Sequence, residues 1–198
     1  MKVLDGFERR REQKKMNILE AALTLFMEYG VQKISIAEIA KNANVSQVTI
    51  YNYFDSKHNL VREVFLYYVD QATDEFDQIL NSPTSFPEKI KQLIFAKKEV
   101  ANQIHEDFYQ YLMKEYTTGL NYIEEIYVEK TIPRLIDLFN EGKQQGYVDP
   151  NLSNEAILFF IQALHEYIQR KDIYQKILPL TEDIMKLMFY GIMGKKEE

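Results

Sequence analysis

The chain of 198 residues contains no cysteine and no tryptophan, and it has only seven glycines and five prolines. The absence of cysteine excludes disulfides, thiolate metal sites and cysteine nucleophiles. No apolar run approaches the roughly 18 residues that a membrane-spanning helix requires. Glu20 and Glu28 interrupt the apolar stretch behind the charged N-terminus, so the sequence predicts no signal peptide. We therefore expect a cytoplasmic protein without a membrane partner.

Motifs of catalysis and of phosphate binding are also missing. The sequence has no glycine-rich phosphate loop and no Gly-x-Ser-x-Gly element. His105-Glu106 and His165-Glu166 invite a metal or catalytic interpretation, but neither pair completes His-Glu-x-x-His. These histidines are more simply explained as satisfied or exposed side chains, or as polar groups of a pocket. We predict that the protein is not an enzyme and holds neither a metal nor a cofactor.

Charge is shared unevenly along the chain. Residues 1–60 hold nine Lys/Arg against seven Asp/Glu, whereas residues 61–198 hold fifteen against twenty-three. Five basic residues of the first part are close together in the sequence: Arg9, Arg10, Arg11, Lys14 and Lys15. DNA affinity depends on local neutralisation of phosphates rather than on net charge, and an acidic body discourages the wrong face from approaching DNA. Taken alone, the asymmetry is explained equally well by a solvated helix face.

Helical periodicity dominates the chain, and no alternating run is long enough to predict a sheet. We predict an all-α protein of about nine helices, with a three-helix N-terminal head and a larger helical C-terminal body. Residues 1–8 are expected to form a loose arm, and Pro133 is expected to kink a long helix. Besides two short helices between residues 35 and 54, helices are predicted at about residues 9–29, 56–80, 87–104, 106–116, 120–145, 153–170 and 181–193.

The most informative stretch is residues 35–59, with the sequence SIAEIAKNANVSQVTIYNYFDSKHN. Ser35 and Glu38 have the spacing of a capping box, and Ser46 is placed to cap a second helix. Asn44 lies between the two helices and tolerates the left-handed conformation of a sharp turn. Apolar residues at helical spacing give the first helix one face for burial: Ile36, Ile39, Ala40 and Ala43. This pattern is typical of a helix-turn-helix, whose second helix lies in the DNA major groove.

The run VSQVTIYNYFDSKHNL resembles the signature of the TetR family of bacterial transcriptional regulators, in which a Val-Ser turn leads into a recognition helix with Tyr-x-Tyr/His-Phe. The preceding ILEAALTLFMEYGVQKISIAEIAKNA is similar to the first two helices of that family. The match covers residues 14–62, about a quarter of the chain. Asn44 departs from the family, which usually has Gly there, and Val48 occupies a position where Gly, Pro or Ala is common.

The resemblance implies a sequence-specific DNA-binding regulator with a double-stranded operator as its partner. Gln47 is expected to pair with an adenine edge or to make a single bond to another base, and Val48 to pack on a thymine methyl group. Lys57 has the position of a phosphate contact. Ser35 is either a further phosphate ligand or a plain helix cap, and Tyr53 is alternatively a core residue. The full set of predicted DNA contacts is Ser35, Ser46, Gln47, Val48, Thr49, Tyr51, Asn52, Tyr53 and Lys57.

The resemblance also implies a division into a DNA-binding domain, residues 1–56, and a helical ligand-binding and dimerisation domain, residues 57–198. Twenty of the 26 aromatic residues follow residue 60, which suits an unidentified small apolar or aromatic ligand. The candidate pocket residues are Phe95, His105, Phe108, Tyr109, Tyr127, Phe159 and His165. Ordinary helical core is the alternative explanation for most of these side chains.

A homodimer is expected from the same resemblance, with two helices of each subunit packed as a four-helix bundle. The candidate interface residues are Ile157, Leu158, Ile161, Leu164, Ile168, Ile184, Leu187 and Met188. Internal core is again the alternative. A two-fold dimer would place two recognition helices on a near-palindromic operator.

Two classes of function remain open at this point. The first is a regulator, most often a repressor in this family, that a small inducer releases from DNA. The second is a helix-turn-helix module that tethers a protein-binding helical body to DNA without any small ligand. The residues alone do not distinguish repression from activation.

Overall fold

A computed structural model describes residues 6–117, 126–168, 170 and 173–192. Over these ranges the chain forms helices, turns and short connections, and none of the described segments is a strand. The prediction of an all-α protein with an N-terminal helix-turn-helix is therefore confirmed.

The chain divides into two compact units. The first unit, called the head here, comprises the residues up to Gln71 together with Ile104–Tyr109. The second unit, called the body, comprises Ala72–Gln103 and the residues from Gln110 onward. The boundary falls inside α4 (Lys57–Asn81), so this helix of 25 residues contributes its first part to the head and its last part to the body.

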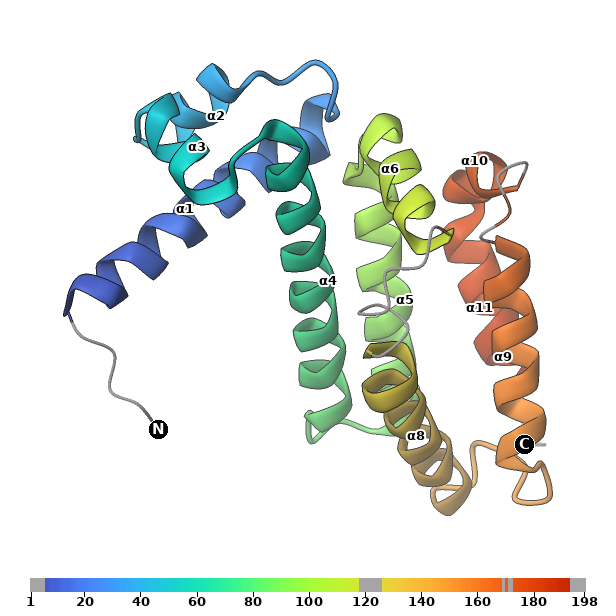
Figure 1. Cartoon of the computed structure of the whole chain (residues 1–198). Coiled ribbons are helices and arrows are strands. Elements are labelled where there is room, and N and C mark those ends of the chain that lie inside the picture. Colours follow the sequence, from blue (N-terminus) through green and yellow to red (C-terminus); the bar gives the residue numbers. More distant parts are fainter. Residues whose placement is uncertain (1–5, 118–125, 169, 171–172, 193–198) are drawn as a thin grey trace. The chain divides into compact units, whose positions relative to one another are not determined.

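The head is built from α1 (Gly6–Tyr29), α2 (Ile36–Asn42), α3 (Gln47–Phe54) and the first part of α4, coloured from blue to green in Figure 1. Residues spaced by four positions place one apolar face of α1 toward the other helices. The core of the head contains these almost fully buried side chains: Ile18, Ala22, Phe26, Ile39, Ala40, Ile50, Phe54, Leu60 and Val64.

The first helix begins at Gly6, before the predicted start at Arg9, so the arm that was expected through residue 8 is helical from residue 6. The remainder of that arm, residues 1–5, lies outside the described residues. The sequence between Glu8 and Lys15 consists of Arg, Glu, Gln and Lys, which have high helix propensity. Glu8 also lies in the first turn, where a negative charge interacts favourably with the helix dipole.

The head also contains the segment Ile104–Tyr109, at the start of α6 (Glu106–Thr117). The ring of Phe108 is fully buried, and its centroid lies 6.2 Å from that of Phe26 and 6.0 Å from that of Tyr68. The backbone N–H of His105 donates to the carbonyl of Met27 over 2.7 Å. A segment that follows α5 in the chain therefore completes the core of the head.

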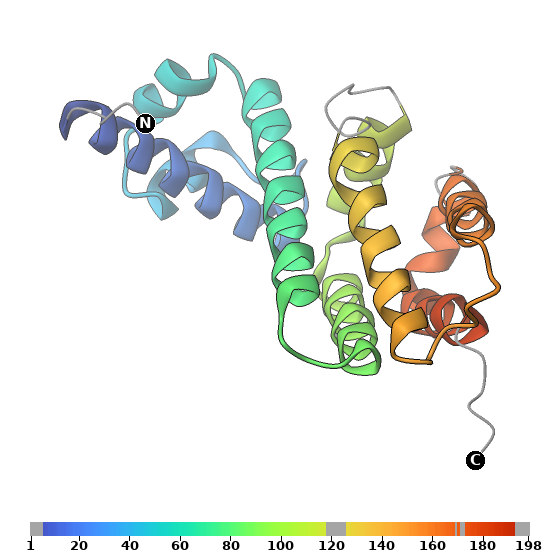
Figure 2. The ribbon, with the colours of Figure 1, turned by 90° about the horizontal axis from the view of Figure 1, so that it is seen from below.

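The main helices of the body after α4 are α5 (Phe86–Gln103), α8 (Ile132–Gln144), α9 (Asn154–Ile168) and α11 (Thr181–Ile192). α11 packs against α5, and α8 packs against both α5 and α9; Figure 2 shows these helices from a second direction. The short α10 (Tyr174–Ile177) and a 3₁₀ turn at Leu178–Leu180 precede α11. The core of the body includes Phe86, Ile90, Leu93, Leu138, Phe139, Val148, Ile157, Ile161 and Phe189.

The region predicted as one kinked helix over residues 120–145 is described from Ile126 onward. A π-helical turn at Tyr127–Thr131 leads into α8, whose first turn holds Pro133. Proline lacks the N–H that continues the helical ladder, and it is tolerated in the first turn of a helix. The change of helix type therefore falls where the proline interrupts the ladder.

A charged side chain, Lys89, is buried between α5 and α8. Only 5% of its surface is exposed, and its Nζ lies 2.8 Å from Oε2 of Glu141. Gln145 accepts a hydrogen bond from the N–H of Phe86 at the start of α5 over 3.0 Å. Removal of Glu141 would leave the buried charge of Lys89 without its partner and would destabilise the contact between α5 and α8.

Candidate nucleic-acid interface

The predicted capping box at the start of α2 is present. The N–H of Glu38 donates to Oγ of Ser35 over 3.2 Å, and the N–H of Ser35 donates to Oε2 of Glu38 over 2.7 Å. The Ser35 hydroxyl donates to the same carboxylate oxygen over 2.7 Å. Hydrogen bonds from the hydroxyl and then the backbone of Ser35, with the nearby charge of Lys57, hold the pKa of the Glu38 carboxyl below its ordinary value. In this structure, Ser35 is a helix cap.

The turn between α2 and α3 depends on a left-handed residue. Asn44 has φ of +52°, as its position in the sequence predicted. The next N–H, that of Val45, donates to the carbonyl of Ala40 over 2.9 Å and so closes the end of α2. Ser46 then caps α3, because its Oγ accepts from the N–H of Thr49 over 3.1 Å. These local contacts determine the direction in which α3 leaves the turn.

The helix α3, which the sequence predicts to be the recognition helix, has one buried face and one exposed polar face. Ile50 and Phe54 are 1% and 3% exposed and belong to the head core. On the opposite side, Val48 is 66% exposed and Tyr51 is 46% exposed. The other predicted base contacts, Gln47 and Asn52, are also exposed. The exposed face thus carries two amides, a phenol and an aliphatic group in a surface that a DNA groove can accept.

Tyr53 is half-buried and connects α3 to α1. Its hydroxyl donates to the carbonyl of Arg11 over 3.1 Å, and the guanidinium carbon of Arg11 lies 5.9 Å from the centroid of its ring. This arrangement combines a hydrogen bond with a cation–π contact. Tyr53 is therefore a structural contact between the two helices, whether or not it also reaches DNA.

Lys57 is the first residue of α4, and its side chain is held in a defined direction. Its Nζ donates to the carbonyl of Val31 over 2.8 Å. An ammonium group has three donors, so two remain for other acceptors such as phosphate oxygens. The preceding Asp55 has φ of +59°, and Ser56 accepts at Oγ from the N–H of Asn59, which caps α4. The sequence did not indicate the left-handed conformation of Asp55.

The loop that contains Val31 is also held from α6. The N–H of Gln32 donates to Oδ2 of Asp107 over 2.9 Å. Gly30 has φ of +85°, and a Cβ at this position would lie 2.8 Å from Nδ1 of His105. Gly30 is thus required for both its conformation and the close approach of α6. The loop before α2 is fixed on one side by Lys57 and on the other by Asp107.

The structure does not gather the predicted pocket residues around one cavity within the described part of the chain. Phe108 is fully buried in the head, where His105 and Tyr109 also belong, whereas Phe159 is 77% exposed on α9. His105 accepts at Nδ1 from the N–H of Asp107 over 3.1 Å. The side chains of Tyr127 and His165 lie outside the described residues.

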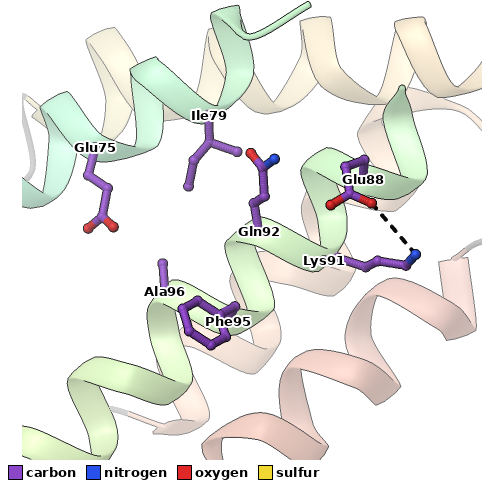
Figure 3. Close-up of a pocket in the computed structure, with 7 residues that line it drawn as sticks. All are labelled: Glu75, Ile79, Glu88, Lys91, Gln92, Phe95 and Ala96. Atoms are coloured by element: carbon purple, nitrogen blue, oxygen red, sulfur yellow. Dashed lines mark ion pairs between the residues drawn. The ribbon is translucent and has the colours of Figure 1, made fainter. Parts of the chain in front are cut away.

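Phe95 lines an open groove between the last part of α4 and α5 (Figure 3). The groove has a volume of about 520 Å³, and the Phe95 side chain is 63% exposed. At one end of the groove, Nζ of Lys91 lies 3.6 Å from Oε2 of Glu88. Its lining residues are Glu75, Ile79, Glu88, Lys91, Gln92, Phe95 and Ala96.

The predicted interface residues on α9 and α11 fall into three groups: buried, half-buried and exposed. Ile157 and Ile161 are buried in the core of the body, and Leu158 and Met188 pack against that core. Leu164, Ile168 and Ile184 are half-buried. Leu187, by contrast, is 74% exposed.

An exposed apolar stripe on the same two helices shares only Leu187 with the predicted set. On α9 it contains Phe159, Phe160 and Tyr167, which are 77%, 44% and 51% exposed, and on α11 it contains Leu187 and Tyr190. At about 100° per residue, adjacent Phe159 and Phe160 and the later Tyr167 fall within an arc of about 100° on α9, and Leu187 and Tyr190 are three residues apart on α11, so each set lies on one side of its helix. The hydrophobic pattern was ambiguous because both sides of α9 are apolar, and only packing shows which side the body core uses.

No helix in the described ranges is long and apolar enough to cross a membrane. The histidine and carboxylate side chains described by the structure form no group of three suited to a metal ion.

Comparison with known proteins places these observations in a family. Residues 18–64 match the family model of bacterial regulatory proteins of the tetR family. Over 149 residues the chain is 27% identical to the HTH-type transcriptional repressor KstR2 of Mycolicibacterium smegmatis, covering 73% of this chain and 72% of the relative. The fold is similar to that of a solved TetR/AcrR family regulator, with a TM-score of 0.59 and 20% identity over 90% of this chain and 99% of that chain. It is also similar to FadR from Bacillus subtilis in complex with stearoyl-CoA, with a TM-score of 0.56 and 20% identity over 89% and 98% of the two chains.

Replacement of Ser35 by alanine is expected to destabilise the head by about 1 kcal/mol, the usual cost of a lost N-cap. It should also raise the pKa of Glu38 toward its ordinary value, because the hydroxyl is the main cause of the lowered pKa. A carboxyl with a lowered folded-state pKa adds stability above its unfolded pKa, and this contribution disappears as the pH falls through the folded-state pKa. The wild type and S35A should therefore differ more at pH 7 than at pH 3.

Urea unfolding across this pH range, with NMR titration of the Glu38 carboxyl, measures both effects. E38Q is the matched control, because it retains a capping side chain that does not titrate. A stability difference between S35A and the wild type that stays constant from pH 7 to pH 3 would contradict the assignment.

Proposed function

The chain belongs to the TetR family of bacterial regulatory proteins, and on this basis we propose that it is a repressor that a small-molecule inducer releases from a near-palindromic operator. In this proposal residues 1–56 read the DNA, and residues 57–198 bind the inducer and form a homodimer. The protein acts in the cytoplasm, where bacterial operators are found.

The exposed face of α3 is the observation that carries the DNA-binding part of the proposal. Its side chains are held by caps and by a buried opposite face, so they are presented without further folding. Gln47 pairs with an adenine edge and Val48 packs on a thymine methyl group, while Tyr51 and Asn52 reach bases or phosphates. These contacts specify the sequence, since phosphate contacts carry no direct sequence information.

Phosphate contacts position the head on the duplex. The ammonium group of Lys57 already has one acceptor, the Val31 carbonyl, and directs its remaining donors to a phosphate. Ser46 and Thr49 are the further phosphate contacts in this proposal. Tyr53 is a phosphate contact only if its hydroxyl, which has a single donor, leaves the Arg11 carbonyl. Ser35 contributes as the N-cap of α2, because the cap orients this helix against the sugar–phosphate backbone of the DNA.

The dimer in this proposal forms through the exposed apolar stripe of α9 and α11. Phe159, Phe160, Leu187 and Tyr190 present large apolar surfaces that a monomer leaves in water. Packing two such helices from each subunit as a four-helix bundle removes that surface from water. Two-fold symmetry then pairs the two recognition helices with the two halves of the operator.

The inducer in this proposal is a small apolar or aromatic molecule that binds the α4–α5 groove. The groove volume of about 520 Å³ lies in the usual range for such ligands, and Phe95 and Ile79 supply apolar surface. α4 contributes Glu75 and Ile79 to the groove and begins at Lys57, so one continuous helix has both a ligand contact and a phosphate contact. An inducer that favours a conformer with displaced heads lowers DNA affinity by its difference in affinity for the two conformers.

The alternative function is a DNA-tethered module whose helical body binds a protein and no small ligand. If Phe159, Phe160 and Tyr167 of α9 do not pack in a homodimer, these exposed side chains offer a surface for another protein and favour this alternative. A ligand that lowers operator affinity separates the two functions, because the alternative has no such response.

The DNA-reading assignment predicts different effects for two substitutions, measured by fluorescence anisotropy on the duplex that the wild type selects from a random pool. K57A should weaken binding to all sequences by about tenfold and reduce the salt slope by about 1, because one phosphate contact is lost. Q47A should instead lose about 1–3 kcal/mol of preference at one base position. Unchanged affinity and salt slope in K57A would contradict the role of Lys57.

The dimer assignment predicts that L187E weakens self-association by about 30-fold or more, since it buries a charge at a central apolar contact. Sedimentation equilibrium measures the dissociation constant. Q144E, which adds the same charge at an exposed position of α8, is the matched control and should leave the dimer unchanged. An L187E protein that remains as dimeric as Q144E would show that the subunits meet elsewhere.

The inducer assignment predicts that a ligand added to the operator complex lowers DNA affinity by about 5- to 150-fold, the usual range of allosteric coupling. The first compound to test is stearoyl-CoA, with which the structurally similar FadR was crystallised. The second is a ketosteroid, because the structurally similar KstR2 of Mycobacterium tuberculosis is a ketosteroid transcriptional regulator. F95A should reduce the response without changing operator affinity in the absence of ligand. A complex that is insensitive to both compounds and to a wider apolar panel would favour the protein-binding alternative.

A further inference from the structure

We propose that the first turns of α1 form a second DNA-contacting surface, in which Arg10, Arg11 and Lys14 bind backbone phosphates that flank the half-site read by α3. This inference rests on the proposed function and deepens it. The ligand is the sugar–phosphate backbone of double-stranded DNA, which the surface recognises by charge without reading bases.

The first turns of α1 form a helix that lacks a core of its own. α1 begins at Gly6, but its first fully buried side chain is that of Ile18. Every residue from Glu8 to Lys14 is exposed. Most helices in proteins are stabilised by packing of an apolar face, which this part of α1 does not have. Its amino acids therefore serve a surface rather than a core.

This part of α1 is fixed to the recognition helix by specific contacts. Arg11 accepts the hydrogen bond of the Tyr53 hydroxyl at its backbone carbonyl, and its guanidinium lies over the Tyr53 ring. One turn later, Nζ of Lys15 lies 2.9 Å from Oε2 of Glu63 and 6.0 Å from the Phe54 ring centroid. The basic turns therefore have a defined place beside the end of α3, whose exposed face carries the base contacts.

Helix geometry sorts the basic residues into two groups. Successive residues of an α-helix are rotated by about 100°, so Lys14 and Arg10 lie about 60° and 100° from Arg11 in one direction. Lys15 lies about 40° away in the other direction, toward its partner Glu63 on α4. Arg9 is rotated by about 160° from Arg11, onto the opposite side of the helix. Arg10, Arg11 and Lys14 therefore form one cationic strip next to the Tyr53 contact.

The charges of this strip are available for an external anion. Lys15 is neutralised by Glu63, but neither Arg10 nor Lys14 forms an ion pair with any residue that the structure describes. Arg11 uses its ring contact with Tyr53, which leaves its guanidinium donors free to bind oxygen atoms. A phosphate backbone that passes the end of α3 offers such oxygen atoms and releases counterions when it is neutralised.

The test compares three proteins on two duplexes. The proteins are the wild type, the double variant R10Q/K14Q, and R9Q as a control that removes one charge from the opposite side of the same helix. One duplex ends at the outer edges of the selected operator, and the other extends it by about one helical turn of ~10 base pairs on each side. Because all three positions are exposed, circular dichroism and sedimentation should show unchanged folding and assembly.

On the extended duplex, R10Q/K14Q should reduce the slope of log affinity against log salt by about 2 per head, while R9Q should leave it nearly unchanged. On the short duplex, the double variant and the wild type should have similar slopes. Sequence preference should be the same for all three proteins, because no base contact is lost.

Three results would overturn this inference. Equal slopes for R10Q/K14Q and the wild type on the extended duplex, with operator selection intact, would refute the second surface and leave the proposed function standing. A loss for R9Q that is half of the loss for the double variant, and so equal per charge removed, would show a general charge effect instead of a defined surface. A wild type that selects no operator from a random pool would refute both the proposed function and this inference.

Discussion

The left-handed turn at Asn44 is the constraint on which the exposed face of α3, the proposed DNA-reading face, depends. Asn44 adopts φ of +52° although it has a Cβ atom, which glycine lacks. The N–H of Val45 then donates to the carbonyl of Ala40 and closes α2. Burial of Ile39, Ala40 and Ile50 on the two sides of the turn offsets the conformational cost of the turn. Because the turn sets the angle of α3, it decides which side chains are exposed on that helix and which are buried.

The loop before α2 connects this reading face to the rest of the chain. Val31 receives the Lys57 ammonium group, Gln32 donates to Asp107, and Gly30 makes room for His105. Lys57 is the first residue of α4, and Asp107 is in the first turn of α6. Both helices therefore contact this loop with their first turn, and both continue into the body. Within the head, the first turns of these two helices therefore hold the loop that leads into α2.

Local features of the head could be predicted from the sequence because their physical causes are local. The capping box of Ser35 and Glu38, the Ser46 cap and the left-handed Asn44 each depend on residues at most a few positions apart. The all-α class followed from periodicity. The entry of Ile104–Tyr109 into the head could not be predicted, since it depends on the contact of Phe108 with residues far away in the chain.

The body was harder to predict for a related reason. α9 is apolar on two sides, and its pattern does not say which side packs on α8 and the rest of the core. Ile157 and Ile161 were predicted at an interface, and they are buried within the body; the exposed stripe around Phe159 had been assigned in part to a pocket. Both assignments depend on where other helices pack, which sequence spacing alone does not contain. The interface and the pocket remain predictions.

Selection of duplexes from a random pool by the wild-type protein, followed by sequencing of the bound fraction, tests the central claim most directly. If the exposed face of α3 reads bases in a two-fold dimer, the bound fraction will be enriched in one near-palindromic sequence with two similar half-sites. Weak, salt-sensitive binding without any enriched sequence would contradict the claim, because it would leave only the charge of the head and no reading of bases.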